Sequence, residues 1–184
     1  MDAFLISTFT VTLAELGDKT QLLSLFLTTK FRNKSAIIGG IFLATLLNHM
    51  LSASLGSWVA QYLQSPIGQW LIGASFVVLG LWLLVPDKDA NDESSLQKYG
   101  AFVTAALLFF LAEMGDKTQI ATILLGAQFN TVWKVTLGTT LGMLLANVPV
   151  IWAGDYIIRR IPLKLVHILA ATVFITLGFV KILN

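Results

Sequence analysis

Leu-Ala-Glu-Leu-Gly-Asp-Lys-Thr-Gln, residues 13–21, recurs as Leu-Ala-Glu-Met-Gly-Asp-Lys-Thr-Gln at residues 111–119, an offset of 98 positions. The same offset aligns the rest of the two halves without a gap. The aligned residues include Phe31 with Phe129, Gly40 with Gly138, Gly56 with Gly154, Phe76 with Phe174 and Gly80 with Gly178. One register over half of the chain indicates internal duplication, so the sequence predicts two copies of a single structural unit.

The composition predicts that both copies lie in a lipid bilayer. Of the 184 residues, 56% are hydrophobic and only 12% are charged, and the mean hydropathy is +0.79, well outside the range of soluble domains. The absence of cysteine excludes disulfides, thiolate metal sites and thiol catalysis. The formal charge of +2 is too small to indicate a nucleic-acid partner.

Apolar runs bounded by charged and turn-forming residues predict six membrane spans. A spanning helix needs about 20 apolar residues, and the runs that we assign are 3–29, 36–60, 67–85, 100–127, 132–154 and 164–183. An acidic linker, residues 87–98, separates a first repeat, 1–86, from a second repeat, 99–184. Each repeat holds three spans, an odd number, so the second repeat enters the membrane from the opposite side. The predicted fold is an all-α polytopic membrane protein with six transmembrane helices as two inverted-topology repeats, a plan found in many secondary transporters.

The basic residues predict the orientation of the chain, because cytoplasmic loops carry an excess of lysine and arginine. An N-terminus outside the cell leaves only Lys134 and Lys181 on the outer side. It places eight basic residues on the inner side: Lys30, Arg32, Lys34, Lys88, Lys98, Arg159, Arg160 and Lys164. We therefore expect both termini outside.

Four carboxylates of the repeated segment lie near the middle of predicted spans: Glu15, Asp18, Glu113 and Asp116. A spacing of three residues puts each pair on one face of a helix. Ionisable groups at this depth cost several kcal/mol each, and they are usually kept for a partner, a cavity or a transported ion. We expect the two pairs to meet at the interface of the repeats and to form a metal site.

Charge balance indicates the cargo of this site. Four carboxylates with the ammonium groups of Lys19 and Lys117 leave a charge of minus two if all are ionised, which one divalent cation balances. Without the metal, repulsion between the carboxylates favours protonation. Metal ions and protons would then compete for the same oxygens, which is the physical basis of an antiporter.

Further oxygen ligands or proton-coupling groups are available nearby in the predicted spans. The candidates are Gln21, Gln119, Thr20, Thr118, Asn48 and Asn147, together with the two lysines. An oxygen-rich set suits Mn²⁺, Ca²⁺ or Mg²⁺, whereas zinc and copper would draw on cysteine or several histidines. Gly17 and Gly115 could loosen the helix and expose backbone carbonyl groups as ligands.

Simpler interpretations exist for several of these residues. Lys19 and Lys117 could form ion pairs with the glutamates four positions earlier, within one helix. Gln21 and Gln119 could form hydrogen bonds between helices instead of binding a metal. His49 could be a proton relay or a ligand, or it could form a hydrogen bond to a neighbouring helix. Two small-residue pairs indicate close helix packing without chemistry, namely Gly138 with Gly142 and Gly40 with Ala44.

The two copies of Glu-x-Gly-Asp-Lys-Thr, at 15–20 and 113–118, resemble the calcium/manganese-proton exchanger family of bacterial, chloroplast and Golgi membranes. The resemblance covers essentially the whole chain. It implies a cation/proton antiporter with Glu15, Asp18, Glu113 and Asp116 in the transport site. The short linker is similar to that of the compact bacterial members, which implies a bacterial inner membrane and manganese export as the leading role.

We therefore expect a secondary active transporter that exports Mn²⁺ or Ca²⁺ against protons by alternating access. The protein is not expected to be an enzyme or to need a cofactor, because the metal is its substrate. A passive divalent cation channel, a helical scaffold and an intramembrane metal-dependent hydrolase are the competing interpretations. The hydrolase lacks a recognisable nucleophile and base in the sequence. The oligomeric state stays open.

Overall fold

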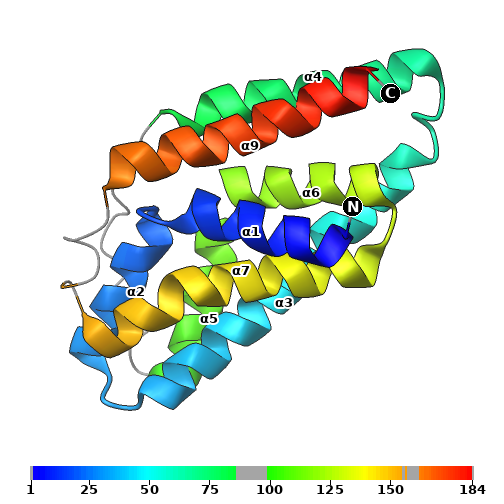
Figure 1. The fold of residues 1–184 in the computed structure, drawn as a ribbon. Helices are drawn as coiled ribbons and strands as arrows, with labels where there is room; N and C mark the ends of the chain where they lie inside the picture. Colours follow the sequence, from blue (N-terminus) through cyan, green and yellow to red (C-terminus); the bar gives the residue numbers. More distant parts are fainter. Residues whose placement is uncertain (1, 86–98, 155, 157–161, 184) are drawn as a thin grey trace.

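The computed structural model describes residues 2–85, 99–154, 156 and 162–183, and in these residues it contains eight helices and no strand (Figure 1). Their bounds are α1 (Ala3–Glu15), α2 (Lys19–Lys30), α3 (Lys34–Ala60), α4 (Pro66–Leu83), α5 (Gly100–Glu113), α6 (Lys117–Phe129), α7 (Val132–Ala153) and α9 (Leu163–Leu183). The predicted linker 87–98 lies outside the described residues, as do Lys88, Lys98, Arg159 and Arg160.

Four of the described helices are long and apolar enough to cross a membrane: α3, α4, α7 and α9. They coincide with four of the six predicted spans. Two of them begin at N-cap residues that bond the first turn. At the start of α3 the Asn33 side chain accepts a hydrogen bond from the Ala36 amide, and at the start of α4 the Ser65 side chain accepts one from the Gly68 amide. These parts of the prediction, an all-helical membrane protein, are confirmed.

The other two predicted spans are each divided into two shorter helices. The segment 3–29 contains α1 and α2, and the segment 100–127 contains α5 and α6. The expectation of one continuous helix through each segment is therefore wrong. The breaks fall at the same place in both repeats, immediately after Glu15 and after Glu113.

Three glycines lie where helices of different repeats come into close contact. A Cβ atom built on Gly138 would lie 2.5 Å from the Phe4 carbonyl oxygen, and one built on Gly142 would lie 2.7 Å from the Thr8 carbonyl oxygen. One built on Gly40 would lie 2.4 Å from the Phe102 carbonyl oxygen. The prediction that these glycines serve close packing is confirmed, and α1 packs on α7 while α5 packs on α3.

The order of these contacts gives the relative directions of the helices. Gly138 of α7 contacts Phe4 of α1, and Gly142 contacts Thr8, so residue numbers increase in the same direction along both helices and the two helices are parallel. The same holds for α3 against the segment formed by α5 and α6, since Gly40 meets Phe102 and Gly56 meets Ile123. The remaining pair, α4 and α9, is antiparallel because Gly73 meets Gly178 whereas Gly80 meets Ala171.

The α4–α9 pair lies along one side of the other helices (Figure 1). Phe76 and Phe174, which occupy the same position in the two repeats, stack at its centre with ring centroids 6.1 Å apart. Both rings are fully buried in an apolar cluster that also includes Val11, Leu125 and Val135. This cluster connects the pair to α1 and α6, the helices that border the acidic residues.

Candidate cation site

The helix breaks have the same backbone geometry in both repeats. Leu16 and Met114 are extended, with φ and ψ of −66° and 114° in the first and −65° and 118° in the second. Gly17 and Gly115 follow with φ of 87° and 77°, a left-handed conformation that glycine adopts without a steric penalty. The repeated motif therefore builds a sharp interruption of each span, and the glycine is the residue that permits it.

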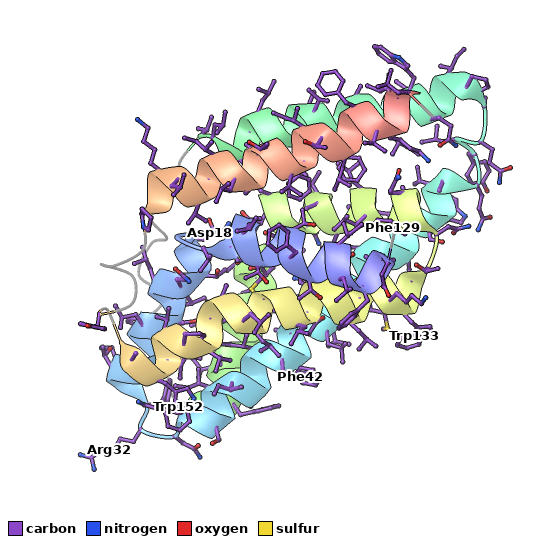
Figure 2. The ribbon with its side chains drawn as sticks, in the orientation of Figure 1. Asp18, Arg32, Phe42, Phe129, Trp133 and Trp152 are labelled. Carbon is purple, nitrogen blue, oxygen red and sulfur yellow. The ribbon has the colours of Figure 1, made fainter. Side chains whose placement is uncertain are left out.

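Each break places its glutamate and its aspartate on different helices. Glu15 is the last residue of α1, whereas Asp18 precedes the first residue of α2. Glu113 and Asp116 hold the same positions at the ends of α5 and α6. The expectation that each pair shares one helix face is wrong. The break also separates Glu15 from Lys19, which pairs with Asp116 and not, as the simpler interpretation had it, with Glu15 within one helix. Figure 2 shows Asp18 at the junction of α1 and α2.

Three of the four predicted carboxylates gather at one point in the structure. Glu15, Glu113 and Asp116 each offer an oxygen, and these three oxygens all lie within 4.8 Å of one another. All three residues are buried, with at most 6% of their surface exposed. Asp18 is also buried but is not part of this group. The cluster draws on both motifs, so neither repeat could form it alone.

Hydroxyl groups from both motifs hold the Glu15 carboxylate. Thr20 donates to Oε2 at 2.7 Å, and Thr118 donates to Oε1 from the other repeat. Glu113 differs, because neither of its carboxylate oxygens accepts a hydrogen bond from any described residue. A buried charged carboxylate without a partner is strongly destabilising. Glu113 is therefore the member of the cluster that most needs a proton or a metal ion.

The two lysines of the motifs occupy different surroundings. The Lys19 ammonium lies 2.8 Å from Asp116 Oδ1, an ion pair between the repeats. Lys117 instead donates to the Val85 carbonyl oxygen at 2.6 Å, and its ammonium lies 5.8 Å from the centroid of the Trp82 ring. Among the described residues, the ion pair between the two motifs is therefore formed once, by Lys19 of the first motif with Asp116 of the second.

The two glutamines brace the helix breaks. Gln21 Oε1 accepts from the Gly17 amide at 2.9 Å, and Gln119 Oε1 accepts from the Gly115 amide at 2.7 Å. Gln21 also donates through Nε2 to the Ala146 carbonyl oxygen at 2.8 Å. The bond from Gln21 to Ala146 joins two helices, which is the alternative to metal binding that the sequence offered for the glutamines. The bonds to the glycine amides were not indicated, and through them each side-chain oxygen already has a hydrogen-bond donor.

The two asparagines lie on the long helices beside the breaks. Asn48 of α3 donates to the Phe110 carbonyl oxygen at 3.1 Å. Asn147 of α7 accepts from the Ser24 hydroxyl at 2.8 Å and donates to the Met143 carbonyl oxygen. Ser24 was not a predicted site residue. Its signal in the sequence is the repeat offset, which pairs it with Thr122, one helical turn after Thr20 and Thr118.

His49 is buried in α3, with 1% of its surface exposed, and neither ring nitrogen has a hydrogen-bond partner among the described residues. His49 therefore does not form the hydrogen bond that we considered for it with any helix of the described part of the chain. Its repeat equivalent is Asn147, so the two halves of the site differ at this position.

Comparison with known proteins gives consistent matches along the chain. The family model for the divalent cation/proton antiporter GDT1 matches residues 3–91 and 101–184. A Vibrio cholerae protein named "Putative manganese exporter" is 49% identical over 179 residues, which cover 97% of this chain and 89% of that protein. The "GDT1-like protein sll0615" of Synechocystis is 25% identical over 198 residues, covering 95% of this chain and 93% of that protein. No solved structure gives a significant match.

These matches confirm the resemblance that the two motifs indicated. The family model spans both motifs and most of the helices around them. It describes transporters rather than enzymes, as expected for this chain. The chain belongs to the GDT1 family of divalent cation/proton antiporters.

Proposed function

We propose that this antiporter exports Mn²⁺, with Ca²⁺ as the alternative cargo, through the carboxylate cluster at the two helix breaks. The observation that carries the proposal is the meeting of Glu15, Glu113 and Asp116, buried and within 4.8 Å by one oxygen each. Asp18, the repeat equivalent of Asp116, is the fourth carboxylate of the transport site. These four residues bind the metal, and the hydroxyls of Thr20 and Thr118 orient Glu15 toward it.

Electrostatic repulsion couples the metal to protons. Like charges a few ångströms apart in a poorly polarisable interior repel strongly, so the cluster is stable with a divalent cation or with bound protons. Glu113 supports this most directly, because no described residue donates a hydrogen bond to its carboxylate. Metal release is therefore favoured by proton binding, which is the coupling that exchange requires.

The donor atoms favour a cation that prefers oxygen. The cluster consists of carboxylates with neighbouring hydroxyls, and the chain has no cysteine. Such ligands suit Mn²⁺ and Ca²⁺. Manganese is the first choice because the Vibrio cholerae relative, 49% identical, is named as a manganese exporter.

Six spans in two inverted repeats are the topology that we propose for this site. The paired short helices α1–α2 and α5–α6 each form one span, and the four long helices form the others. Helices α1 and α7 are parallel, as are α3 and the α5–α6 segment, while α4 and α9 are antiparallel. These directions are the ones that six alternating spans require, and they support the proposal.

Interrupted helices suit the transport site of such a protein. Discontinuous spans place helix ends near the middle of the membrane, where backbone groups can contact the ion. In alternating access the cluster takes metal from the cytoplasm and releases it to the outer side as protons enter. We place both termini outside and the protein in a bacterial inner membrane. Export against a negative-inside potential costs about 2.3 kcal/mol per charge per 100 mV, which inward proton movement can supply.

Metal-driven proton movement tests this function. The purified chain is reconstituted into liposomes that contain a pH dye, and Mn²⁺ or Ca²⁺ is added outside. We expect the lumen to lose protons as metal enters, with Mn²⁺ giving the larger response. Glu113→Gln and Asp116→Asn should abolish the response, whereas Asp2→Asn, at an exposed helix cap, should retain it.

The other outcomes separate the competing functions. Metal entry without proton movement in sealed vesicles would indicate a passive channel. Wild-type exchange by Glu113→Gln would contradict the carboxylate site, even if the protein is an antiporter. A larger response to Ca²⁺ would change the cargo and leave the site intact.

A further inference from the structure

The two repeats share their sequence pattern but pack differently. Helix α6 lies along α3 and contacts α4, and α1 contacts α9. The repeat-equivalent pairs, α2 with α9 and α5 with α4, make at most marginal contact, and α2 packs far less extensively on α7 than α6 packs on α3. In Figure 1 α6 runs beside the α4–α9 pair, whereas α2 points away from it.

Equivalent residues confirm this difference at atomic scale. A Cβ atom on Gly56 would lie 1.9 Å from the Ile123 carbonyl oxygen, whereas one on Gly154, its equivalent, would have no described residue within 4 Å. Leu111 and Met114 are 52% and 57% exposed, while their equivalents Leu13 and Leu16 are only partly exposed. Helices α1 and α6 are covered by the neighbouring helices α3, α4 and α9. Helices α2 and α5 are less covered by neighbouring helices.

The hydrogen-bond partners of Lys19 and Lys117 differ between the repeats, as the packing of the helices does. Lys19, on the less covered α2, is bonded to Asp116 at the start of α6. Lys117, on the covered α6, is bonded to the Val85 carbonyl oxygen beyond the end of α4. Val85 has Leu183, at the end of α9, as its equivalent in the second repeat. Exchanging the packing of the repeats would therefore offer Lys19 a carbonyl group at Leu183 and Lys117 a carboxylate at Asp18.

We propose that Lys19 and Lys117 are alternating tethers, each forming the ion pair between the motifs in one of two conformations of the transporter. The conformation seen here is the one that Lys19 stabilises by bonding Asp116. In the exchanged conformation Lys117 bonds Asp18, α2 packs along α7, and α6 moves away from α3. This inference deepens the proposed function, because it assumes that the repeats exchange conformations, and it makes both lysines positioning residues.

The chemistry of the motif explains why a lysine suits this role. A tethered ammonium can neutralise one aspartate when no metal binds it, which lowers the repulsion within the cluster. Unlike a bound ion, the lysine is part of the chain and cannot leave the site. Its ion pair with the aspartate therefore holds together the two helices that carry these residues. Only one tether forms at a time in this arrangement, because the two pairs belong to opposite packings of the same helices.

Distances between spin labels test the exchange directly. The chain has no cysteine, so two engineered cysteines suffice for each measurement. One pair, Arg32→Cys with Leu165→Cys, reports the separation of the α2 end from α9. The other pair, Thr131→Cys with Ile67→Cys, reports the separation of the α6 end from α4. All four positions are exposed, and double electron–electron resonance in metal-free lipid nanodiscs gives the population of each distance.

Lys19→Gln and Lys117→Gln should shift these populations in opposite directions. Lys19→Gln should shorten the Arg32–Leu165 distance and lengthen the Thr131–Ile67 distance, changing the ratio of the two populations roughly tenfold, as expected for the loss of one charged hydrogen bond. Lys117→Gln should enrich the conformation described here. Lys19→Arg, which keeps the charge, should restore the wild-type distributions.

The proposal fails if both substitutions move the populations in the same direction, or if Lys19→Gln leaves the ratio unchanged. These readings do not depend on transport. A chain that exchanges no metal but shifts as expected would contradict the proposed cargo and support the tethers. A chain that transports Mn²⁺ with unchanged distances in Lys19→Gln would do the reverse.

Discussion

The hydroxyl of Thr118, in the second motif, donates a hydrogen bond to the carboxylate of Glu15, in the first motif. Thr20 donates to the other oxygen of the same carboxylate. Both hydroxyls are buried, so no bulk water can replace either donor. In the proposed transport site, this contact orients the Glu15 carboxylate from the opposite repeat.

Thr118→Val should weaken metal binding without unfolding the protein. Valine keeps the shape of threonine and removes only the hydroxyl that orients Glu15. Hydrogen bonds to charged groups contribute about 1.5–3 kcal/mol, so we expect KM for Mn²⁺ to rise by roughly tenfold or more. Thr122→Val is the matched control, because among the described residues the Thr122 hydroxyl bonds only the Thr118 carbonyl oxygen of its own helix. Equal KM values for the two variants in the liposome assay would contradict this role.

The contact of α3 with α6 predicts a strong effect of a single methyl group. A Cβ atom on Gly56 would overlap the Ile123 carbonyl oxygen at 1.9 Å, so Gly56→Ala must separate the two helices. Overpacking of this kind typically costs 1–3 kcal/mol, so we expect a reduction of about that size in the free energy of unfolding. The measurement is thermal unfolding in detergent.

Gly39→Ala is the matched control on the same helix. Its Cβ atom would approach only the Phe102 side chain, at 3.3 Å, and a side chain can shift by a few tenths of an ångström. We expect a melting temperature close to that of the wild type. If Gly56→Ala proves as stable as Gly39→Ala, the close packing of α3 on α6 is not the arrangement in the membrane.

Much of this architecture was predictable from hydropathy and from the repeat. The four long helices follow directly from apolar runs, and the glycines at 40, 138 and 142 indicated the helix contacts correctly. The meeting of Glu15 with Glu113 and Asp116 followed from the duplication, because equivalent residues of two related repeats approach one another at their interface.

The helix breaks were not predictable from the same signals. The segment 3–29 was assigned as one span because apolar runs flank the polar motif on both sides, and hydropathy does not report φ and ψ. Gly17 was a weak indication, since glycine also occurs inside continuous helices. The partners of Lys19 and Lys117 depend on how the repeats pack in one conformation, and two identical motifs cannot reveal that difference.

Gly115→Ala should impair transport through backbone strain alone. Gly115 has a φ of 77°, and a Cβ atom on it would meet no described residue within 4 Å, so no clash with these residues contributes. A left-handed residue other than glycine costs roughly 1–2 kcal/mol, which favours straightening of the break and displacement of Asp116. We expect a lower rate of Mn²⁺-driven proton movement. Gly115→Asn should retain more activity, because asparagine tolerates this conformation better, and equal rates for both variants would count against backbone strain.

His49→Asn should leave transport close to the wild-type rate. The substitution makes the first repeat match the second, where Asn147 accepts a hydrogen bond from the Ser24 hydroxyl. The equivalent hydroxyl is that of Thr122. Since Ala53 contacts Gly126, the turn of α3 that contains His49 lies beside the turn of α6 that contains Thr122. The Thr122 hydroxyl already donates to the Thr118 carbonyl oxygen, so an asparagine there could donate its amide group to the Thr122 oxygen, and we also expect a higher melting temperature.

The outcome distinguishes a structural histidine from one that carries protons. A proton relay through His49 would stop working with an amide in its place, because asparagine does not titrate. A folded His49→Asn protein that still binds Mn²⁺ but no longer couples it to proton movement would show that His49 belongs to the transport pathway. Retained coupling would leave the carboxylates and lysines of the two motifs as the proton sites, since these are the other titratable side chains at the helix breaks among the described residues.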